Sequence, residues 1–156
     1  IRYPRGSAHQ GLREYQAPVE YGRSEIIRKG KKIAVLGVGS MIPSCMEICK
    51  GLKDDGYDPT FVNARFVKPL DVDLLDELAK DHSLFVTVEE NVKSGGYGEH
   101  VSAYMEACHP EIRVLSAAVW DRFVPQGNVE SLRSRIGLGV EDIRQAIEDS
   151  EELREQ

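Results

Sequence analysis

The stretch VTVEENVKSGGYGEH, residues 86–100, holds the end of a strand, a glycine-rich loop and the first turn of a helix in direct succession. The apolar run LFVTV that leads into it is almost continuous, which is typical of a strand covered on both faces. A strand that passes through a short loop into a helix is the repeating unit of a parallel α/β sheet. Because glycine-rich loops at the start of a helix often hold phosphates, the stretch also raises the question of a nucleotide site.

Strand-like runs and helical periodicity alternate in the same way between residues 33 and 119. This alternation predicts an α/β fold of three layers, in which a mostly parallel sheet carries helices on both faces and right-handed crossovers join the strands. Two neighbouring strand-like runs, 24–28 and 33–36, are separated by a short turn rich in lysine and glycine. They predict a hairpin that adds one antiparallel strand to the sheet.

Capping residues mark the predicted helix boundaries. Ser40 is predicted to cap the first long helix, with Pro43 in its first turn and Gly56 at its end. Asp71 and Asn128 are predicted to cap two later helices. The helical residues predicted to face the core are Met41, Cys45, Ile48, Cys49, Leu52, Leu74, Leu75, Leu78, Ala79, Val101, Tyr104, Met105, Cys108, Val140, Ile143, Ala146 and Ile147.

The composition is that of one soluble globular domain, with 156 residues, 41% hydrophobic and 29% charged. The formal net charge is −6 and no cluster of lysine and arginine occurs, which argues against nucleic acid as a partner. The longest apolar runs, such as IAVLGVG, are too short to span a membrane. Three cysteines, an odd number, do not suggest a disulfide framework and favour a reducing, cytoplasmic location.

The segment GVGSMIPS follows the first buried strand, where a dinucleotide-binding fingerprint would lie. Gly37 and Gly39 match that fingerprint, but Ile42 occupies the position of the third glycine. The end of the next strand, at residues 63–65, offers no carboxylate for a ribose. We therefore expect a tight strand-to-helix turn at this position rather than a nicotinamide site.

The glycine-rich loop departs from the phosphate-binding pattern in a similar way. Its glycines are Gly95, Gly96 and Gly98, and no Gly-Lys-Ser/Thr sequence follows them. Glu89 and Glu90 precede the loop, and Glu99 stands where a phosphate would favour a cation. Such negative charge suits a sugar hydroxyl, an amine or a basic neighbouring surface better than a phosphate. A packing or interface role is therefore favoured over a ligand site.

The cysteines and histidines form no obvious site. Cys45 and Cys49 lie one helical turn apart, as metal ligands can, but they belong to an apolar stripe and have no second ligand pair. Core packing is predicted for both, and for Cys108. His82 is predicted near a helix C-terminus, where a partly positive imidazole favours the helix dipole. The four histidines are His9, His82, His100 and His109, and the sequence leaves their spatial neighbours open.

Arg5 lies between a proline and a glycine in the opening segment IRYPRG, which has no initiator methionine and suggests a piece of a longer chain. A guanidinium held at such a turn is a good bidentate clamp for a phosphate. A surface ion pair is the commoner role of a single arginine.

Four segments, IRYPRG, NARFVKPLD, LFVTVEENVKSGGYGEHV and WDRFVPQG, occur in this order along the chain. Together they closely resemble the C-terminal part of the 1-deoxy-D-xylulose-5-phosphate synthase family, and the resemblance runs over essentially the whole chain. Related C-terminal domains occur in transketolase and in the beta subunits of 2-oxoacid dehydrogenases. In those relatives we expect different sequences in place of RFVKPLD and VEEN.

The resemblance implies a parent enzyme of the transketolase-type transferase class. Such a synthase is a homodimer that condenses pyruvate, after loss of CO2, with glyceraldehyde 3-phosphate, and it uses thiamine diphosphate and Mg2+. Its product is the precursor of isoprenoids, thiamine and pyridoxal. By resemblance, residues 1–6 are the last strand of the pyrimidine-binding domain, residues 7–21 a linker, and residues 22–156 the C-terminal domain with the transketolase C-terminal fold.

Carried over residue by residue, the resemblance places Arg5 near the phosphate of the acceptor substrate. It assigns no catalytic, cofactor-binding or metal-binding residue to this chain, because the motifs for thiamine diphosphate, Mg2+ and proton transfer belong to upstream parts of the enzyme. The fragment alone is therefore predicted to be inactive. The residues expected at an interface with companion domains or the other subunit are Glu89, Glu90, Gly95, Gly96 and Gly98.

Two alternatives remain open at this point. In one, the chain is a free-standing module that binds a small molecule or nucleotide at the carboxyl edge of its sheet, near residues 37–40 and 95–98. In the other, it is the C-terminal domain of a 2-oxoacid dehydrogenase beta subunit.

Overall fold

A computed structural model of the chain describes residues 9–15 and 17–150. The strands in this part are β1 (Glu25–Arg28), β2 (Lys32–Gly37), β3 (Thr60–Asn63), β4 (His82–Val92) and β5 (Arg113–Val119). Its helices are the 3-10 helix η1 (Gly39–Met41) and the α-helices α1 (Ile42–Asp54), α2 (Val72–Ala79), α3 (Tyr97–Cys108), α4 (Val129–Arg135) and α5 (Val140–Glu148).

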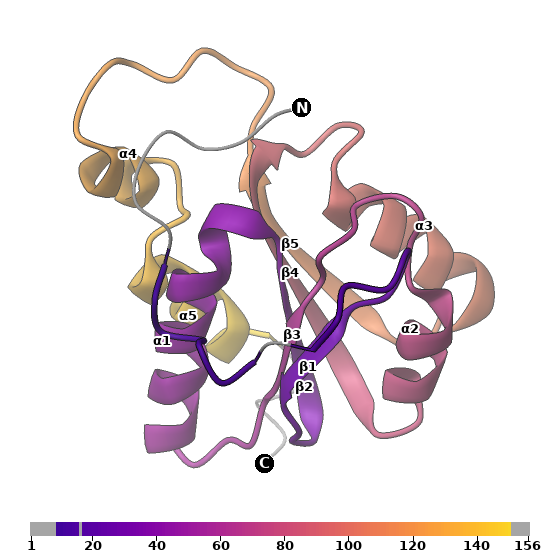
Figure 1. Cartoon of the computed structure of the whole chain (residues 1–156). Helices are drawn as coiled ribbons and strands as arrows, with labels where there is room; N and C mark the ends of the chain where they lie inside the picture. Colours follow the sequence, from indigo (N-terminus) through magenta and orange to yellow (C-terminus); the bar gives the residue numbers. More distant parts are fainter. Residues whose placement is uncertain (1–8, 16, 151–156) are drawn as a thin grey trace.

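The elements form three layers around one sheet with the strand order β1-β3-β2-β4-β5. Strands β2, β3, β4 and β5 run parallel, and β1 is antiparallel to β3. Figure 1 shows α1, α4 and α5 on one side of the sheet and α2 and α3 on the other. The predicted three-layer α/β fold, with its mostly parallel sheet and one antiparallel strand, is therefore confirmed.

The predicted hairpin between the first two strands is wrong. β1 is antiparallel, as expected, but it pairs with β3, which lies between β1 and β2. β3 lies inside the sheet, where its backbone pairs with β2 on one side and with β1 on the other, and all its side chains except that of Asn63 are buried. The turn after β1 crosses the start of β3 instead, where the Gly30 amide donates to Thr60 Oγ1 at 2.9 Å.

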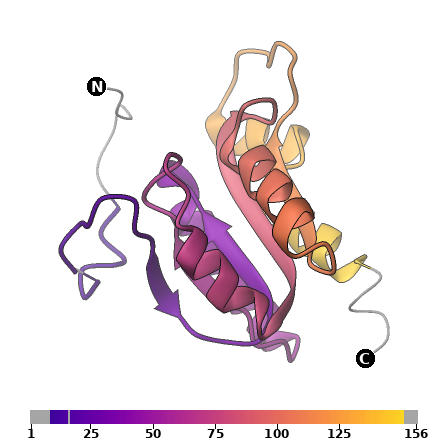
Figure 2. The ribbon, with the colours of Figure 1, turned by 90° about the vertical axis from the view of Figure 1, so that its right-hand side faces the viewer.

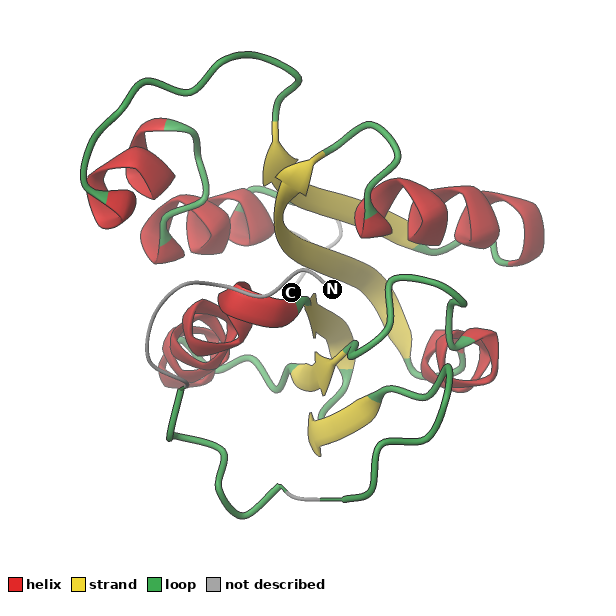
Figure 3. Cartoon of the chain, turned by 45° about the horizontal axis from the view of Figure 1, so that its top comes forward, coloured by secondary structure: helices red, strands yellow, loops and turns green. Residues whose placement is uncertain are grey.

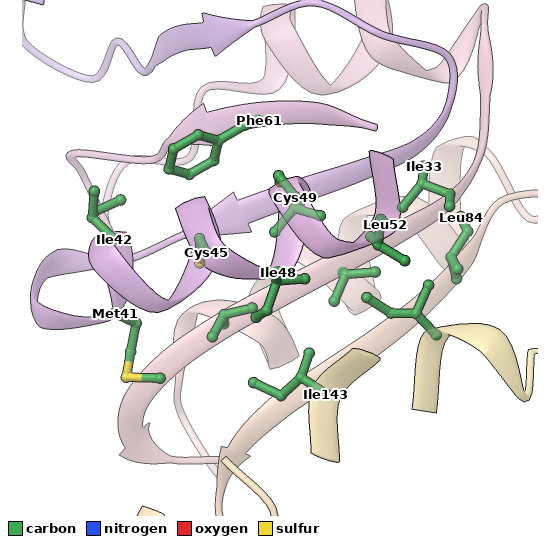
Figure 4. Close-up of a cluster of buried hydrophobic side chains, with 14 of the residues drawn as sticks. Ile33, Met41, Ile42, Cys45, Ile48, Cys49, Leu52, Phe61, Leu84 and Ile143 are labelled. Carbon is green, nitrogen blue, oxygen red and sulfur yellow. The ribbon is translucent and has the colours of Figure 1, made fainter. Parts of the chain in front are cut away.

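The larger part of the core lies between the sheet and the pair α1 and α5. Helix α1 contributes Cys45, Ile48, Cys49 and Leu52, which point toward the sheet and toward Ile143 of α5 (Figure 4). The predicted packing of Cys45 and Cys49 in the core is confirmed, since both are buried. Burial raises the pKa of both thiols, and that of Cys49 reaches about 12.

A second cluster fills the space between the sheet and helices α2 and α3, which cover the other face (Figure 2). Leu75 and Leu78 of α2 and Val101 and Met105 of α3 are buried there, as predicted. Cys108, predicted for the core, is exposed, because it lies in the last turn of α3 beyond the buried stripe. Ala146 of α5 was also predicted to face inward and is exposed.

Two of the three predicted caps are confirmed. The side chain of Asp71 accepts from the Leu74 amide at the start of α2, and that of Asn128 accepts from two amides at the start of α4. Ser40 does not cap α1, because a 3-10 turn lies between it and the helix. The hydroxyl of Ser40 donates to Glu90 Oε2 at 2.7 Å instead. Pro43 lies in the first turn of α1, as predicted.

His82 lies beside the last turn of α2, as predicted, but it is buried, and burial disfavours the positive charge that the sequence suggested. Its Nδ1–H donates to the Leu78 carbonyl at 2.8 Å, because a carbonyl oxygen only accepts, and its Nε2 is hydrogen-bonded to the Thr60 hydroxyl at 2.7 Å. Burial lowers the pKa of His82 below its ordinary value of 6.5, against the opposing effects of the Leu78 carbonyl and of Asp81. The imidazole therefore joins the last turn of α2 to the starts of β3 and β4.

We expect the free energy of unfolding to fall as the pH is lowered below about 6.5. Because the pKa of His82 is lower in the folded chain than in the unfolded chain, the unfolded chain binds more protons in this window. Urea unfolding at a series of pH values measures the slope. A His82→Gln variant should show a smaller slope, whereas His100→Gln, at an exposed position, should keep the wild-type slope because His82 is retained. Equal slopes for all three proteins would contradict the assignment.

Candidate functional site

The candidate site lies at the carboxyl edge of the sheet, between the ends of β2 and β4. β2 leads through α1 to β3 on one side, whereas β4 lies on its other side and leads through a loop to α3. The helices that follow these two strands, α1 after β2 and α3 after β4, lie on opposite sides of the sheet, as Figure 3 shows. In open α/β sheets, ligands bind where connections diverge in this way.

The amides of the glycine-rich loop point toward a carboxylate that belongs to the chain itself. Glu89 is 1% exposed, and its two oxygens accept from the Tyr97 amide at 2.9 Å and the Gly98 amide at 2.8 Å. These are the first two amides of α3, where the helix dipole favours an anion. Glu89 thus occupies the position at which a phosphate would bind in a nucleotide site.

The remaining amides of the loop also have partners within the chain. The Gly95 amide donates to Glu99 Oε2 at 2.5 Å, and the Gly96 amide donates to the Lys93 carbonyl at 3.1 Å. Glu99, which looked unfavourable for a phosphate, is therefore part of the loop's own hydrogen bonding. No amide of residues 95–98 is left to bind an external anion.

The glycines of the loop meet distinct steric demands. Gly95 has a φ of +72°, which side chains rarely adopt. A Cβ atom on Gly96 would lie 2.6 Å from Glu89 Oε1, and one on Gly98 would lie 2.0 Å from Ser116 Oγ. The last two glycines are needed because the helix start packs directly on the carboxylate and on β5.

Glu90 links the loop after β2 to helix α4 at the neighbouring part of the carboxyl edge. Its Oε2 accepts from the Ser40 hydroxyl after β2, and its Oε1 accepts from Arg133 Nε of α4 at 3.0 Å. This network joins three elements across the point where the connections diverge.

A Cβ atom on Gly37 would lie 2.8 Å from Cys45 Sγ, so the first glycine of GVGS serves tight helix packing, as expected.

The arrangement provides no metal centre and no paired general acid and base at this edge. The described ranges, 9–15 and 17–150, contain no group of three histidine, cysteine or acidic side chains that could hold a metal ion. With the loop amides occupied by Glu89 and Glu99, these residues do not fit a diphosphate either.

Two features of this region were missed by sequence reasoning. One is the Ser40–Glu90–Arg133 network, and the other is the exposure of the segment WDRFVPQG, in which Trp120 is 59% exposed and Phe123 fully exposed. Lys93 of the glycine-rich loop lies 5.4 Å from the centre of the Trp120 ring. Aromatic residues within a polar loop that contains proline and glycine were the available signal for an interaction surface.

The predicted site residues are not all placed by the structure. Glu89 is buried beneath the loop, Gly96 and Gly98 are buried within it, and Glu90 and Gly95 are exposed at the surface. Arg5 lies outside the described residues.

The fold is that of a three-layer α/β domain with a mostly parallel sheet. The chain belongs to the family described as "Transketolase, C-terminal domain", whose model matches residues 22–143. In the described part of the chain, no helix has the length and apolar character needed to cross a membrane.

Curated relatives match nearly the whole length of the chain. It is 40% identical over 144 residues, 92% of the chain, to a 1-deoxy-D-xylulose-5-phosphate synthase of Lachnoclostridium phytofermentans. It is 39% identical over 148 residues, 94% of the chain, to the enzyme of that name from Dictyoglomus thermophilum. The chain spans only 23% and 24% of the lengths of these two relatives.

Solved structures agree with the fold. A split-gene transketolase, titled an inactive beta4 tetramer, superimposes with a TM-score of 0.80 at 29% identity and covers 86% of this chain and 44% of that one. The transketolase of Campylobacter jejuni superimposes with a TM-score of 0.57 over 83% of this chain and 19% of that one. At 18% identity, the second match shows the shared fold alone.

We expect Glu89→Gln to lower the free energy of unfolding by about 1–3 kcal/mol, because an amide leaves one of two buried backbone donors without an acceptor. The matched control Glu90→Gln removes an exposed carboxylate one residue away and should cost less than about 1 kcal/mol. Chemical denaturation measures both values. An equal cost for the two variants would show that the buried carboxylate does not hold the helix start.

Proposed function

We propose that the chain is the C-terminal domain of a 1-deoxy-D-xylulose-5-phosphate synthase. The observation that carries this proposal is the identity of about 40% to curated synthases over nearly the whole chain. The parent protein would condense pyruvate with glyceraldehyde 3-phosphate and release CO2. Transketolase-type enzymes depend on thiamine diphosphate, which the whole protein would bind together with Mg2+.

The chain itself would be structural rather than catalytic. It spans about a quarter of its synthase relatives, and its described residues offer no free amide cradle or metal cluster for thiamine diphosphate and Mg2+. The cofactor and the metal would therefore be held by the rest of the protein. The similarity to a split-gene transketolase chain titled inactive supports the same interpretation.

The domain boundaries follow from this proposal. Residues 1–6 would complete the preceding pyrimidine-binding domain, residues 7–21 would link the two domains, and residues 22–156 would form the C-terminal domain. We propose a cytoplasmic homodimer as the working form.

The glycine-rich loop would contribute to the contact with the companion domains or with the second subunit. Glu89 holds the loop against the start of α3, so that Gly95 and Glu90 face outward in a fixed arrangement. A loop fixed from beneath loses little conformational entropy when a partner packs on it. Gly96 and Gly98 would serve this contact indirectly, because they allow the loop to lie close to the sheet.

The whole protein, expressed from its complete reading frame, should release CO2 from pyruvate when glyceraldehyde 3-phosphate, thiamine diphosphate and Mg2+ are all present. The 156-residue chain under the same conditions should release none. A radiometric CO2 assay with chromatography of the sugar phosphate measures both. Turnover by the 156-residue chain alone would contradict the proposal. So would formation of NADH with coenzyme A and a lipoyl-bearing partner, which would indicate a 2-oxoacid dehydrogenase.

Arg5 is proposed to contact the phosphate of the acceptor substrate in the whole protein. A charge-assisted hydrogen bond contributes about 1.5–3 kcal/mol, so Arg5→Ala should lower kcat/KM for glyceraldehyde 3-phosphate by roughly 10- to 100-fold. The rate with unphosphorylated glyceraldehyde should change little. Arg13→Ala, in the linker, serves as the matched control and should leave both acceptors unaffected. Equal losses with the two acceptors would exclude a phosphate contact.

A further inference from the structure

A cavity lies away from the carboxyl edge, between α1 and the segment that precedes β1. Its volume is about 280 Å3, close to the lower limit of ordinary small-molecule sites, which begin at roughly 300 Å3. Residues 12–15, β1, β3 and α1 all contribute to its lining, and Figure 1 shows the N-terminal segment, in indigo, beside α1. The cavity shares no lining residue with the network around Glu89 and Glu90, so the site described above does not account for it.

The floor of the cavity is apolar. Phe61 of β3 and Cys49 of α1 are buried there, and burial raises the pKa of the Cys49 thiol to about 12, so this side chain is uncharged. Met46 and Ile27 line the cavity from α1 and β1, and Leu12 lines it from the N-terminal segment. These last three side chains pack against the core but are only partly buried. An apolar ligand that covers them gains the free energy of removing their remaining surface from water.

The rim of the cavity carries unpaired positive charge. Lys50 and Lys53 are exposed and lie three residues apart on α1, so their side chains are neighbours on the helix surface. Within residues 9–15 and 17–150, neither ammonium group takes part in an ion pair or a hydrogen bond. Arg28 also lines the cavity, but it forms an ion pair with Asp58. Glu14 contributes a carboxylate from the N-terminal segment, so the two lysines leave a surplus of one positive charge.

We propose that this cavity binds a small amphiphilic anion with a single negative charge, such as a carboxylate on an aromatic or aliphatic body. The body lies on the apolar floor, and the carboxylate lies at the two lysines of α1. A carboxylate accepts charge-assisted hydrogen bonds from ammonium groups. The surplus of one positive charge matches a monoanion better than a phosphate dianion.

A ligand at this position contacts two parts of the chain at once. Leu12 and Tyr15 belong to the segment 7–21, which is proposed as the linker, whereas Met46 and Ile27 belong to the domain itself. Binding therefore holds the segment around residue 13 against α1. This consequence does not depend on which reaction the whole protein catalyses.

Three compounds of one shape and different charge test the site. They are 4-phenylbutyrate, 4-phenylbutan-1-ol and 4-phenylbutylammonium, each titrated into the 156-residue chain. The methyl resonances of Leu12, Ile27 and Met46 should shift saturably with 4-phenylbutyrate. Its Kd should be roughly 10-fold lower than that of the alcohol, because two exposed ammonium groups together contribute about that factor. The ammonium compound should bind more weakly than the alcohol.

The double variant Lys50→Gln with Lys53→Gln removes both cations from exposed helical positions. It should bind the acid roughly 10-fold more weakly than the wild-type chain does and the alcohol equally well. The matched control, Lys29→Gln with Lys31→Gln, makes the same change in net charge at exposed positions outside the cavity and should keep both affinities. Met46→Trp fills the cavity and should abolish binding of both compounds while circular dichroism stays unchanged.

Trypsin cleavage after Arg13 measures the effect on the N-terminal segment. At ten times its Kd, 4-phenylbutyrate should slow this cleavage roughly 10-fold in the wild-type chain and leave it unchanged in Met46→Trp. A wild-type chain without saturable methyl shifts at about 20 mM 4-phenylbutyrate overturns the proposal. Equal affinities for the acid and the alcohol, full acid affinity without the two lysines, or cleavage unaffected by saturating ligand overturn it as well.

Discussion

The carboxylate of Glu89 is the interaction on which the arrangement of the carboxyl edge depends. It lies at the end of the buried part of β4, and it holds the first two amides of α3 from beneath the loop. An ionised group removed from water is stabilised only when its oxygens are well bonded, and here each oxygen accepts a backbone amide. The same bonds remove the helix start as a binding site for external anions.

This constraint connects the fold to the role of the chain. In many α/β proteins the corresponding helix start binds a ligand, whereas here the chain supplies its own anion. Glu90 closes the adjacent position by joining the end of β2 to α4. Both acidic side chains therefore fix the relative positions of sheet, loop and helices. In the proposed function, a domain organised in this way supports chemistry that other parts of the protein perform.

The layers of the fold were predictable because they follow from local patterns. Helical periodicity located the buried faces of α1 and α2, and the caps at Asp71 and Asn128 depend only on neighbouring amides. The pairing of β1 was not predictable in this way, since its partner β3 lies about 35 residues further along the chain. Ser40 was mispredicted for a similar reason, because its hydroxyl is taken by Glu90, 50 residues away.

The candidate site was predictable in position but not in detail. Glu89 and Glu90 are adjacent and identical in type, and the start of α3, which packs over Glu89 alone, decides which one is buried. Amide resonances of the 15N-labelled chain, titrated with thiamine diphosphate and Mg2+, test the central claim most directly. If Glu89 occupies the helix start, the resonances of Tyr97 and Gly98 will not move. Saturable shifts of these two amides would show instead that the loop binds the diphosphate.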